Sequence, residues 1–304
     1  MTKRYHQAVL ASCEIPWDEN YNLIETTFRE EVRGTIALGF NNLYIFGTAG
    51  EGYAVTVSQF TDIVSLFGEE TGGDDVHPMV GVIGMSTAQV VEKIGIAHDM
   101  GFRAFQISLT PWGELTDDEY MTYFTDVCGS FPDSKFLHYN LPRPKRVLMV
   151  EDYKRLQDAV PNLAATKFTS ATADQCARLV RETDIQHFFS EGNFPIGCLY
   201  GECSLLTSLG AMIPKRTHEY FGYGVAGDFE NLFRLHTRIM LVIDDFIGST
   251  AGQTGIDGAY DKMIVRSAGV DMPLRLLSPY QGFSLEVFDR MMQTLEEKHG
   301  DWME

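Results

Sequence analysis

The feature that most constrains the fold of this chain is an alternation of short apolar segments with longer amphipathic ones. The strand-like segments are 8–15, 43–46, 77–83, 102–109, 134–141, 163–169, 185–191 and 203–207. The helix-like segments that follow them are 21–38, 56–67, 86–100, 116–131, 150–159, 173–182, 196–201 and 214–220. Alternating strands and helices are typical of parallel sheets, and eight repeats favour a closed barrel over an open doubly wound sheet. The sequence therefore predicts the α/β class and a (β/α)8, or TIM, barrel.

Three further helical segments follow the eighth repeat, at 229–247, 258–267 and 284–298, and a Gly-rich stretch at 248–255 is expected to be the loop between the first two. We therefore predict a barrel over residues 1–224 and a C-terminal helical extension over residues 225–304. With 304 residues and 44% apolar content, the chain is long enough to bury a core of that size.

The charge balance and the cysteines exclude several classes of protein. The chain has 24 basic and 42 acidic residues, which argues against a nucleic-acid or anionic-membrane partner, since both need clustered Lys and Arg. Five cysteines with no CxxC pair predict neither a disulfide framework nor a zinc site. The polar start and the lack of any apolar run near the roughly 18 residues of a membrane span predict no signal peptide or anchor, and hence a cytoplasmic protein.

Lys167 is the residue that most needs an explanation, because it lies inside the apolar segment 163–169. Burying an ammonium group is costly, and desolvation lowers the pKa of the amine. A neutral lysine can attack a carbonyl carbon and form a Schiff base. The alternative is a strand-end lysine whose stem packs while its head reaches water.

Two more stretches fall at strand ends, where the active sites of TIM barrels lie. Tyr139 ends the fifth strand and points into the barrel if His138 faces the helices; alternatively it is a core aromatic residue with a satisfied hydroxyl. The segment 47–52 follows the second strand, and its glycine spacing matches no nucleotide-binding motif. Its backbone N–H groups and the Thr48 hydroxyl can instead bind a small anion such as a carboxylate.

Together these stretches resemble the dihydrodipicolinate synthase/N-acetylneuraminate lyase family. The stretches 47–51 (GTAGE), 139–142 (YNLP) and 167–170 (KFTS) are similar in order and spacing to its GTTGE, YNxP and KxTS motifs. The family's members are class I, Schiff-base-forming (β/α)8 enzymes, commonly tetramers, that act on 2-oxo acids. The resemblance implies that Lys167 forms the Schiff base, Tyr139 transfers protons, and Thr48 is a proton relay and carboxylate contact.

The substrate-binding residues depart from the family pattern. Ala49 replaces the second hydroxyl of the carboxylate loop, so the backbone of Ala49 and Gly50 must contribute more. Pro144 stands where synthases carry a dicarboxylate-binding arginine, and Arg143 and Arg146 are displaced from that position.

Further departures affect the distal part of the site. Trp112 is followed by Gly113 where synthases have a tyrosine that reaches a neighbouring subunit, and Gly192 is followed by Asn193 and Phe194 where sialic acid lyases have acidic residues. Both named activities are therefore disfavoured. Trp112 and Phe194 suggest an apolar distal pocket near Gly192, or else they serve packing or a subunit interface.

We therefore predict a Schiff-base lyase for pyruvate or a longer 2-oxo acid, as a homotetramer or homodimer without a cofactor. No metal is expected, because the eight histidines show no HxH or HxxxH pair. Aldol cleavage or condensation, dehydration of a 2-keto-3-deoxy sugar acid, and a non-catalytic 2-oxo-acid-binding role all stay open.

Overall fold

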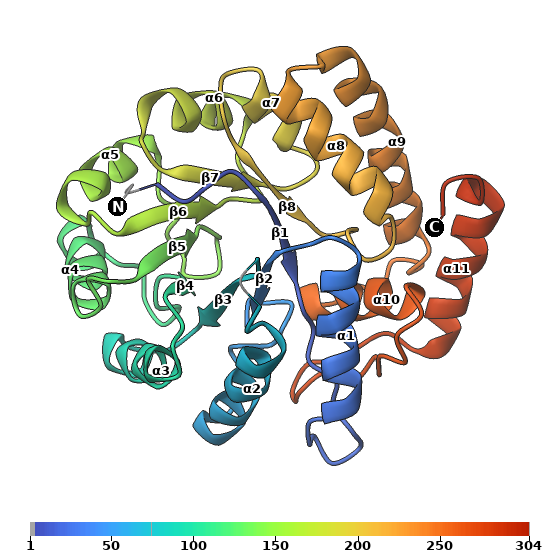
Figure 1. Cartoon of the computed structure of the whole chain (residues 1–304), viewed down its shortest axis with the longest axis horizontal. Helices are drawn as coiled ribbons and strands as arrows, with labels where there is room; N and C mark the ends of the chain where they lie inside the picture. Colours follow the sequence, from blue (N-terminus) through green and yellow to red (C-terminus); the bar gives the residue numbers. More distant parts are fainter. Residues whose placement is uncertain (1–3, 74, 304) are drawn as a thin grey trace.

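The barrel predicted from the sequence is confirmed in the computed structural model, which describes residues 4–73 and 75–303. Eight parallel strands close on themselves, because each pairs with the next and β8 pairs with β1 (Figure 1). The strands are β1 (Val9–Ser12), β2 (Asn42–Ile45), β3 (His77–Val82), β4 (Ala104–Ile107), β5 (Lys135–Tyr139), β6 (Leu163–Lys167), β7 (Gln186–Phe189) and β8 (Ser204–Thr207). The first three residues of the polar start lie outside the described residues.

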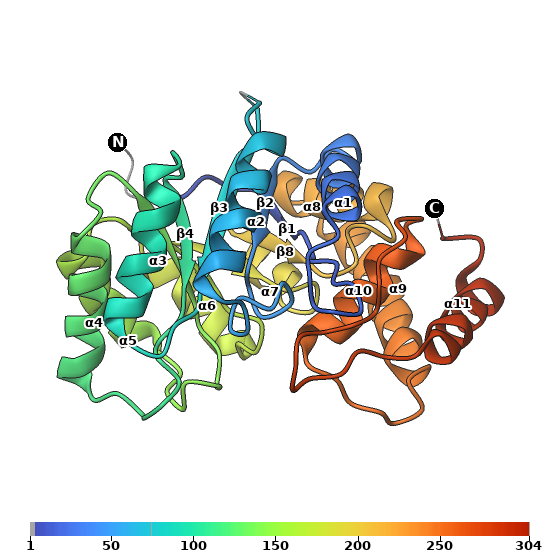
Figure 2. The ribbon, with the colours of Figure 1, turned by 90° about the horizontal axis from the view of Figure 1, so that it is seen from below.

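Helices surround the barrel and continue beyond it. Those between and after the strands are α1 (Glu25–Ala37), α2 (Val57–Glu70), α3 (Thr87–Asp99), α4 (Asp117–Gly129), α5 (Val150–Ala159), α6 (Ala173–Glu182), α7 (Phe194–Cys198) and α8 (Pro214–Ala226). The C-terminal helices α9 (Phe229–Gly248), α10 (Asp257–Ser267) and α11 (Leu285–His299) gather at one side of the barrel (Figure 2). No described helix is long and apolar enough to cross a membrane.

The apolar side chains divide between the interior of the barrel and the layer between strands and helices. The interior cluster is small and includes Leu10, Tyr44, Leu137 and Phe188, whereas the larger cluster fills the outer layer. Side chains along a strand alternate between these two environments. The alternation is what turns selected polar residues inward near the strand ends.

An irregularity in the pairing of β5 and β6 helps to place Lys167. Phe136 pairs with Leu163, but the next residue, Leu137, pairs with Ala165, so β6 has one extra residue there. Bulges of this kind change the facing of the side chains that follow. After the shift, Tyr139 and Lys167 are paired neighbours at the ends of their strands.

The first helix begins later than the sequence predicts. Residues 21–24 were expected to be helical, but α1 starts at Glu25. The Asp18 side chain accepts hydrogen bonds from the backbone N–H groups of Asn20 and Asn22, and Tyr21 has a φ of 62°. This turn competes with the helix, as Asp side chains commonly do.

The seventh and eighth helices also differ from the expected ranges. The helix α7 starts at Phe194 instead of residue 196, because Asn193 and Phe194 donate backbone hydrogen bonds to the Ser190 carbonyl. The helix α8 runs on to Ala226, past the expected end at residue 220, and is followed by Gly227 with a φ of 68°. A glycine accepts this left-handed conformation at little cost.

Candidate active site

Lys167 lies inside the barrel at the end of β6 and is only 4% exposed. Its Nζ donates a hydrogen bond to the Tyr44 hydroxyl at 2.9 Å. The same atom lies 4.1 Å from the centre of the Tyr139 ring and 4.7 Å from the centre of the Tyr44 ring. Two tyrosines from β5 and β2 therefore hold the amine between their rings.

The protein surroundings of Lys167 favour the neutral form of its amine more strongly than bulk water would. Within the described ranges, the Tyr44 hydroxyl is the only group that the amine hydrogen-bonds, and no carboxylate forms an ion pair with it. Burial lowers the pKa of Lys167 to about 8, although the carboxyl groups of Asp257, Asp261 and Glu14 oppose this change. About a tenth of the amine is therefore neutral and available as a nucleophile at pH 7, far more than for an exposed lysine.

Tyr139 faces the interior because its neighbour His138 faces outward. The His138 ring lies 2.8 Å from the Tyr153 hydroxyl of α5, and burial lowers the pKa of His138 to about 3. Burial also raises the pKa of Tyr139 to about 12, so this phenol keeps its proton at neutral pH. Thr48 and Arg143 are the polar groups that face the Tyr139 hydroxyl.

The loop after β2 offers unused backbone donors. Among the described residues, the N–H groups of Thr48, Ala49 and Gly50 have no acceptor, whereas the next two residues bond back within the loop. A side chain at Gly47 would meet the Tyr44 ring, since a Cβ there would lie 2.7 Å from Tyr44 Cε2. Free N–H groups in a tight loop can bind a small anion.

Arg143 joins this group of residues and Arg146 does not. The Arg143 guanidinium lies 3.4 Å from Thr48 Oγ1 and forms an ion pair with Asp257, the first residue of α10, at 2.7 Å. Arg146 instead donates to the Leu115 carbonyl and pairs with Asp117. The structure thus places Arg143, and not Arg146, beside Thr48.

A buried ion pair fastens the loop after β2 to the C-terminal extension. Glu51 and Lys262 of α10 are fully buried and 2.7 Å apart, and the Glu51 carboxylate also accepts hydrogen bonds from Trp17 Nε1 and the backbone N–H of Leu277. Gly258 lets α10 approach closely, because a Cβ there would lie 2.5 Å from the Ala49 carbonyl oxygen. The extension thus completes the mouth of the barrel.

The expected apolar distal pocket is not formed by the two aromatic residues predicted for it. Trp112 is 80% exposed, and its carbonyl accepts a hydrogen bond from Lys145. Phe194 is fully buried against the rings of Tyr220 and Phe221. Phe194 is therefore a packing residue, and the prediction of a pocket lined by Trp112 and Phe194 was wrong. Gly192 has open space around its Cα.

Several residues of the site were not identified from the sequence. Tyr44 contacts Lys167 directly, and Asp257 pairs with Arg143. The buried Glu14 and the half-buried Asp261 are carboxyl groups that act on the charge of Lys167. Glu14 carried a usable signal, because it is an acidic residue inside the apolar segment 8–15. Asp257 and Asp261 gave none, since they come from the extension.

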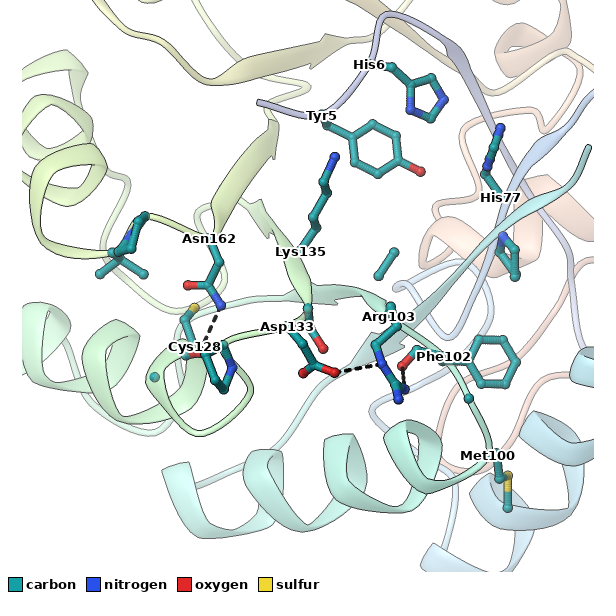
Figure 3. Close-up of a pocket in the computed structure, with 18 of the residues that line it drawn as sticks. Tyr5, His6, His77, Met100, Phe102, Arg103, Cys128, Asp133, Lys135 and Asn162 are labelled. Carbon is teal, nitrogen blue, oxygen red and sulfur yellow. Dashed lines mark hydrogen bonds and ion pairs between the residues drawn. The ribbon is translucent and has the colours of Figure 1, made fainter. Parts of the chain in front are cut away.

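A large cavity lies at the other end of the barrel. It has a volume of about 910 Å³ and is bordered by residues at the starts of strands, such as His77 and Lys135 (Figure 3). In Figure 3 the Lys135 side chain extends toward Tyr5, and Arg103 is paired with Asp133. Lys167 and Tyr139 end their strands, so this cavity is separate from the candidate active site.

Comparisons with known proteins agree with this geometry. The model of the "Dihydrodipicolinate synthetase family" matches residues 6–298. A 4-hydroxy-tetrahydrodipicolinate synthase of Ralstonia nicotianae is 23% identical over 90% of this chain and 93% of its own, and an N-acetylneuraminate lyase of Shigella boydii is 24% identical over 58% and 59%.

A solved structure is similar over nearly its whole length. It is an Escherichia coli K12 prophage protein of the dihydrodipicolinic acid synthase family, in complex with pyruvate. It has a TM-score of 0.85 and 14% identity, and the match covers 96% of this chain and 98% of that one. At this identity the likeness supports the fold, and the family model supports the membership. Because that model matches almost every residue, the chain belongs to the dihydrodipicolinate synthetase family.

Proposed function

We propose that this protein is a Schiff-base-forming lyase that acts on pyruvate or a longer 2-oxo acid. Members of its family are lyases of the class I aldolase type. The observation that carries the proposal is the buried amine of Lys167, which has no carboxylate partner among the described residues and lies 4.1 Å from the Tyr139 ring. A lysine in such a setting is suited to attack a ketone.

Substrate binding begins at the loop after β2. The free N–H groups of Thr48, Ala49 and Gly50 and the Thr48 hydroxyl bind the carboxylate of the 2-oxo acid. This contact orients the adjacent carbonyl carbon toward Nζ of Lys167. Attack by the neutral amine gives a carbinolamine, and loss of water gives an iminium that accepts electrons from the neighbouring carbon–carbon bond.

Tyr139 then moves the proton of the reacting hydroxyl. Its hydroxyl faces Thr48 and Arg143, and its raised pKa keeps it protonated until a base or a substrate oxygen needs it. For carbon–carbon cleavage, Tyr139 accepts the proton of the aldol hydroxyl as it passes its own proton to Thr48. For dehydration, it donates its proton to the leaving hydroxyl, which departs as water. Both outcomes use the same residues.

The mouth of the barrel favours a substrate with hydroxyl groups. Arg143 is already paired with Asp257, so a second substrate carboxylate would have to displace an ion pair. The pair offers both donors and acceptors to a polyol chain. This observation favours a 2-keto-3-deoxy sugar acid, in a dehydratase or aldolase reaction, over the dicarboxylate product of a synthase.

The proposal predicts that the chain is not a working dihydrodipicolinate synthase. Pro144 replaces the expected arginine, and the Arg143 charge is engaged. Losing a charge-assisted contact to a substrate carboxylate costs about 2–5 kcal/mol, or some thirty- to several-thousand-fold in rate. Rapid condensation of pyruvate with aspartate semialdehyde would contradict this assignment.

Trapping the iminium tests the central claim. Incubation with pyruvate and borohydride should add one reduced pyruvoyl group, which peptide mapping should place on Lys167. Lys167→Ala should take up none, and Lys135→Ala is the matched control, because Lys135 lies at the opposite end of the barrel. If no adduct forms, a non-catalytic 2-oxo-acid-binding role is the better explanation. Labelling that persists in Lys167→Ala would show that another lysine forms the imine.

A substrate panel then separates the reactions. Pyruvate with a series of aldehydes tests aldol chemistry, and 2-keto-3-deoxy acids test dehydration and cleavage. Family members act on 2-oxo acids and are often oligomeric. We extend this to a cytoplasmic homotetramer or homodimer without a cofactor, and sedimentation analysis checks the assembly.

A further inference from the structure

The hydroxyl group of Tyr44 is buried in the barrel interior, and packing alone does not account for it. Tyr44 is only 3% exposed, and its ring belongs to the interior apolar cluster with Leu10 and Phe188. A phenylalanine would fill the same space without the cost of burying a hydroxyl group. Nζ of Lys167 donates a hydrogen bond to this hydroxyl at 2.9 Å. The hydroxyl therefore points to a role at the reactive amine.

The strand and the loop after it hold the Tyr44 ring at this position. Tyr44 is paired with Ser12 of β1 on one side and with Met79 of β3 on the other. The ring also lies directly against the backbone of Gly47, where a Cβ would be 2.7 Å from Tyr44 Cε2. Tyr44 thus fills the space between the proposed carboxylate-binding loop and the nitrogen of Lys167.

The proposed reaction makes this contact more important once the imine has formed. A protonated imine has one N–H group and no lone pair on its nitrogen, so it can donate a hydrogen bond but cannot accept one. Only this protonated form withdraws electrons strongly from the neighbouring carbon atoms. Hydrogen bonding to a charged form stabilises it. An acceptor beside the Lys167 nitrogen is therefore in the right place to keep the imine reactive.

We propose that the Tyr44 hydroxyl oxygen accepts the N–H group of the Lys167 imine and so keeps this intermediate protonated, as a second catalytic tyrosine beside Tyr139. This inference rests on the proposed function, because it assumes that Lys167 forms an imine. The nitrogen stays on the same side chain of β6 before and after the reaction, so the contact with Tyr44 persists. Tyr44 stabilises the charge on the nitrogen, and Tyr139 moves the proton of the substrate.

The other groups around the nitrogen do not make this contact. The titratable and charged groups that face Lys167 are Glu14 after β1, Tyr44 of β2, Tyr139 of β5, Arg143 of the loop after β5, and Asp257 and Asp261 of α10. Within the described part of the chain, none of the three carboxyl groups lies within hydrogen-bond distance of Nζ, although all three favour its charged form. Tyr139 presents the face of its ring, whose centre is 4.1 Å from Nζ and attracts a cation without accepting its proton.

Hydrogen–deuterium exchange at the methyl group of pyruvate provides the test, because it needs no second substrate. The iminium loses a methyl proton to give an enamine, which takes a deuteron from D2O, and NMR follows the loss of the methyl signal. Tyr44→Phe keeps the ring and removes the acceptor. At saturating pyruvate we expect the exchange rate to fall about ten- to a hundredfold near pH 8, which is the usual contribution of a hydrogen bond to a charged group.

The pH dependence separates this role from a structural one. Without its acceptor the imine loses its proton more readily, so the protonated fraction falls most at high pH. A more acidic solvent restores the proton, so the rate of Tyr44→Phe should approach that of wild type as the pH falls to about 6. The base that takes the methyl proton is the same in both proteins and cancels in the ratio of the two rates.

Tyr5→Phe is the matched control. Tyr5 is another buried tyrosine of the interior cluster, and its hydroxyl donates to Asn42 at the start of β2, at the end of the barrel opposite Lys167. This substitution removes the same atom from the same core and should leave the exchange rate unchanged. Melting temperatures near that of wild type, and a borohydride adduct on Lys167 in Tyr44→Phe at about pH 6, check that fold and amine are intact.

Each outcome has a definite meaning. Wild-type exchange in Tyr44→Phe near pH 8 overturns the role of Tyr44 and leaves the proposed function standing. A rate loss that is the same at every pH, or a Tyr44→Phe protein that loses its fold, assigns the hydroxyl a structural role and also overturns the inference. Wild-type protein that forms no borohydride adduct overturns both proposals, since there is then no imine for Tyr44 to stabilise.

Discussion

Lys167 and Lys262 are two buried lysines with opposite surroundings. Lys262 is fully buried in the interface between α10 and the loop after β2, where it pairs with Glu51 at 2.7 Å and also donates to the Arg275 carbonyl. Lys167 is buried in the barrel and meets only a tyrosine hydroxyl within hydrogen-bond distance. Burial lowers the pKa of both lysines, and a carboxylate in direct contact opposes this effect only at Lys262.

The difference shows how the same side chain can serve structure or chemistry. A direct carboxylate partner favours the charged form of the amine, which then serves as a structural ion pair. Carboxyl groups at a greater distance, such as Asp257 and Asp261, keep the pKa of Lys167 from falling further without blocking the lone pair. The reactivity of a buried lysine therefore depends on whether a carboxylate contacts its amine directly, as well as on how deeply the amine is buried.

The largest expected effect comes from removing the reactive lysine. Lys167→Met should abolish turnover and adduct formation while making the fold more stable at neutral pH. The pKa of Lys167 falls from 10.5 to about 8 on folding, which corresponds to an unfavourable contribution of about 3 kcal/mol.

The pH dependence of this stability gain provides its control. The unfolded chain binds more protons at Lys167 than the folded chain between about pH 8 and pH 10.5, so wild-type stability rises with pH in that window. The advantage of Lys167→Met in urea unfolding should thus be full below pH 8 and absent above pH 10.5. A variant less stable than wild type at pH 7 would contradict the comparison.

Tyr139→Phe should reduce turnover by roughly 10²–10⁴-fold, the usual range for lost general acid–base catalysis. The ring still fills its place beside Lys167, so the melting temperature should stay within a few degrees of wild type and the adduct should still form. Steady-state kinetics, thermal melting and borohydride trapping together check this. Near-normal turnover would imply that Thr48 or water transfers the proton. Unfolding of the variant would imply that Tyr139 is mainly a packing residue of the core.

Lys262→Met should have the opposite effects to Lys167→Met: it should lower the stability of the fold and leave adduct formation intact. It leaves the Glu51 carboxylate buried with only hydrogen-bond donors, and breaking a buried pair in this way costs about 3–5 kcal/mol of stability. Below its unfolding transition the variant should still form the adduct on Lys167. If urea unfolding shows that the free energy of unfolding falls by well under 1 kcal/mol, the ion pair of Lys262 with Glu51 does not stabilise the fold as the geometry indicates.

The smallest expected effect is a shift of the pH profile. Adduct formation should slow about tenfold for each pH unit well below the pKa of Lys167, since only the neutral amine attacks. Asp257→Asn removes the carboxyl group that does most to raise this pKa, so the midpoint should move to lower pH. Asp271→Asn, at an exposed ion pair with Arg266, is the control. A midpoint that moves upward would contradict the proposed role of Asp257.

Patterns in the sequence were enough to predict the barrel and the strand ends that carry Lys167, Tyr139 and Thr48. These follow from local patterns: hydrophobic periodicity fixes the element type, and alternation along β5 fixes which way Tyr139 faces. The same local patterns did not predict the start of α1 or the positions of Phe194 and Trp112. The Asp18 turn shortened α1, and hydrophobicity alone could not tell that Phe194 packs against Tyr220 whereas Trp112 is exposed.

The residues that complete the site are brought together by contacts between distant parts of the sequence. The contact between Lys167 and Tyr44 spans 123 positions of the sequence, and the one between Arg143 and Asp257 spans 114. No local pattern encodes such pairs, because closing the barrel and docking α10 on the loop after β2 bring them together. The burial that lowers the pKa of Lys167 is likewise a property of the closed barrel, since an exposed lysine in the same segment would stay charged.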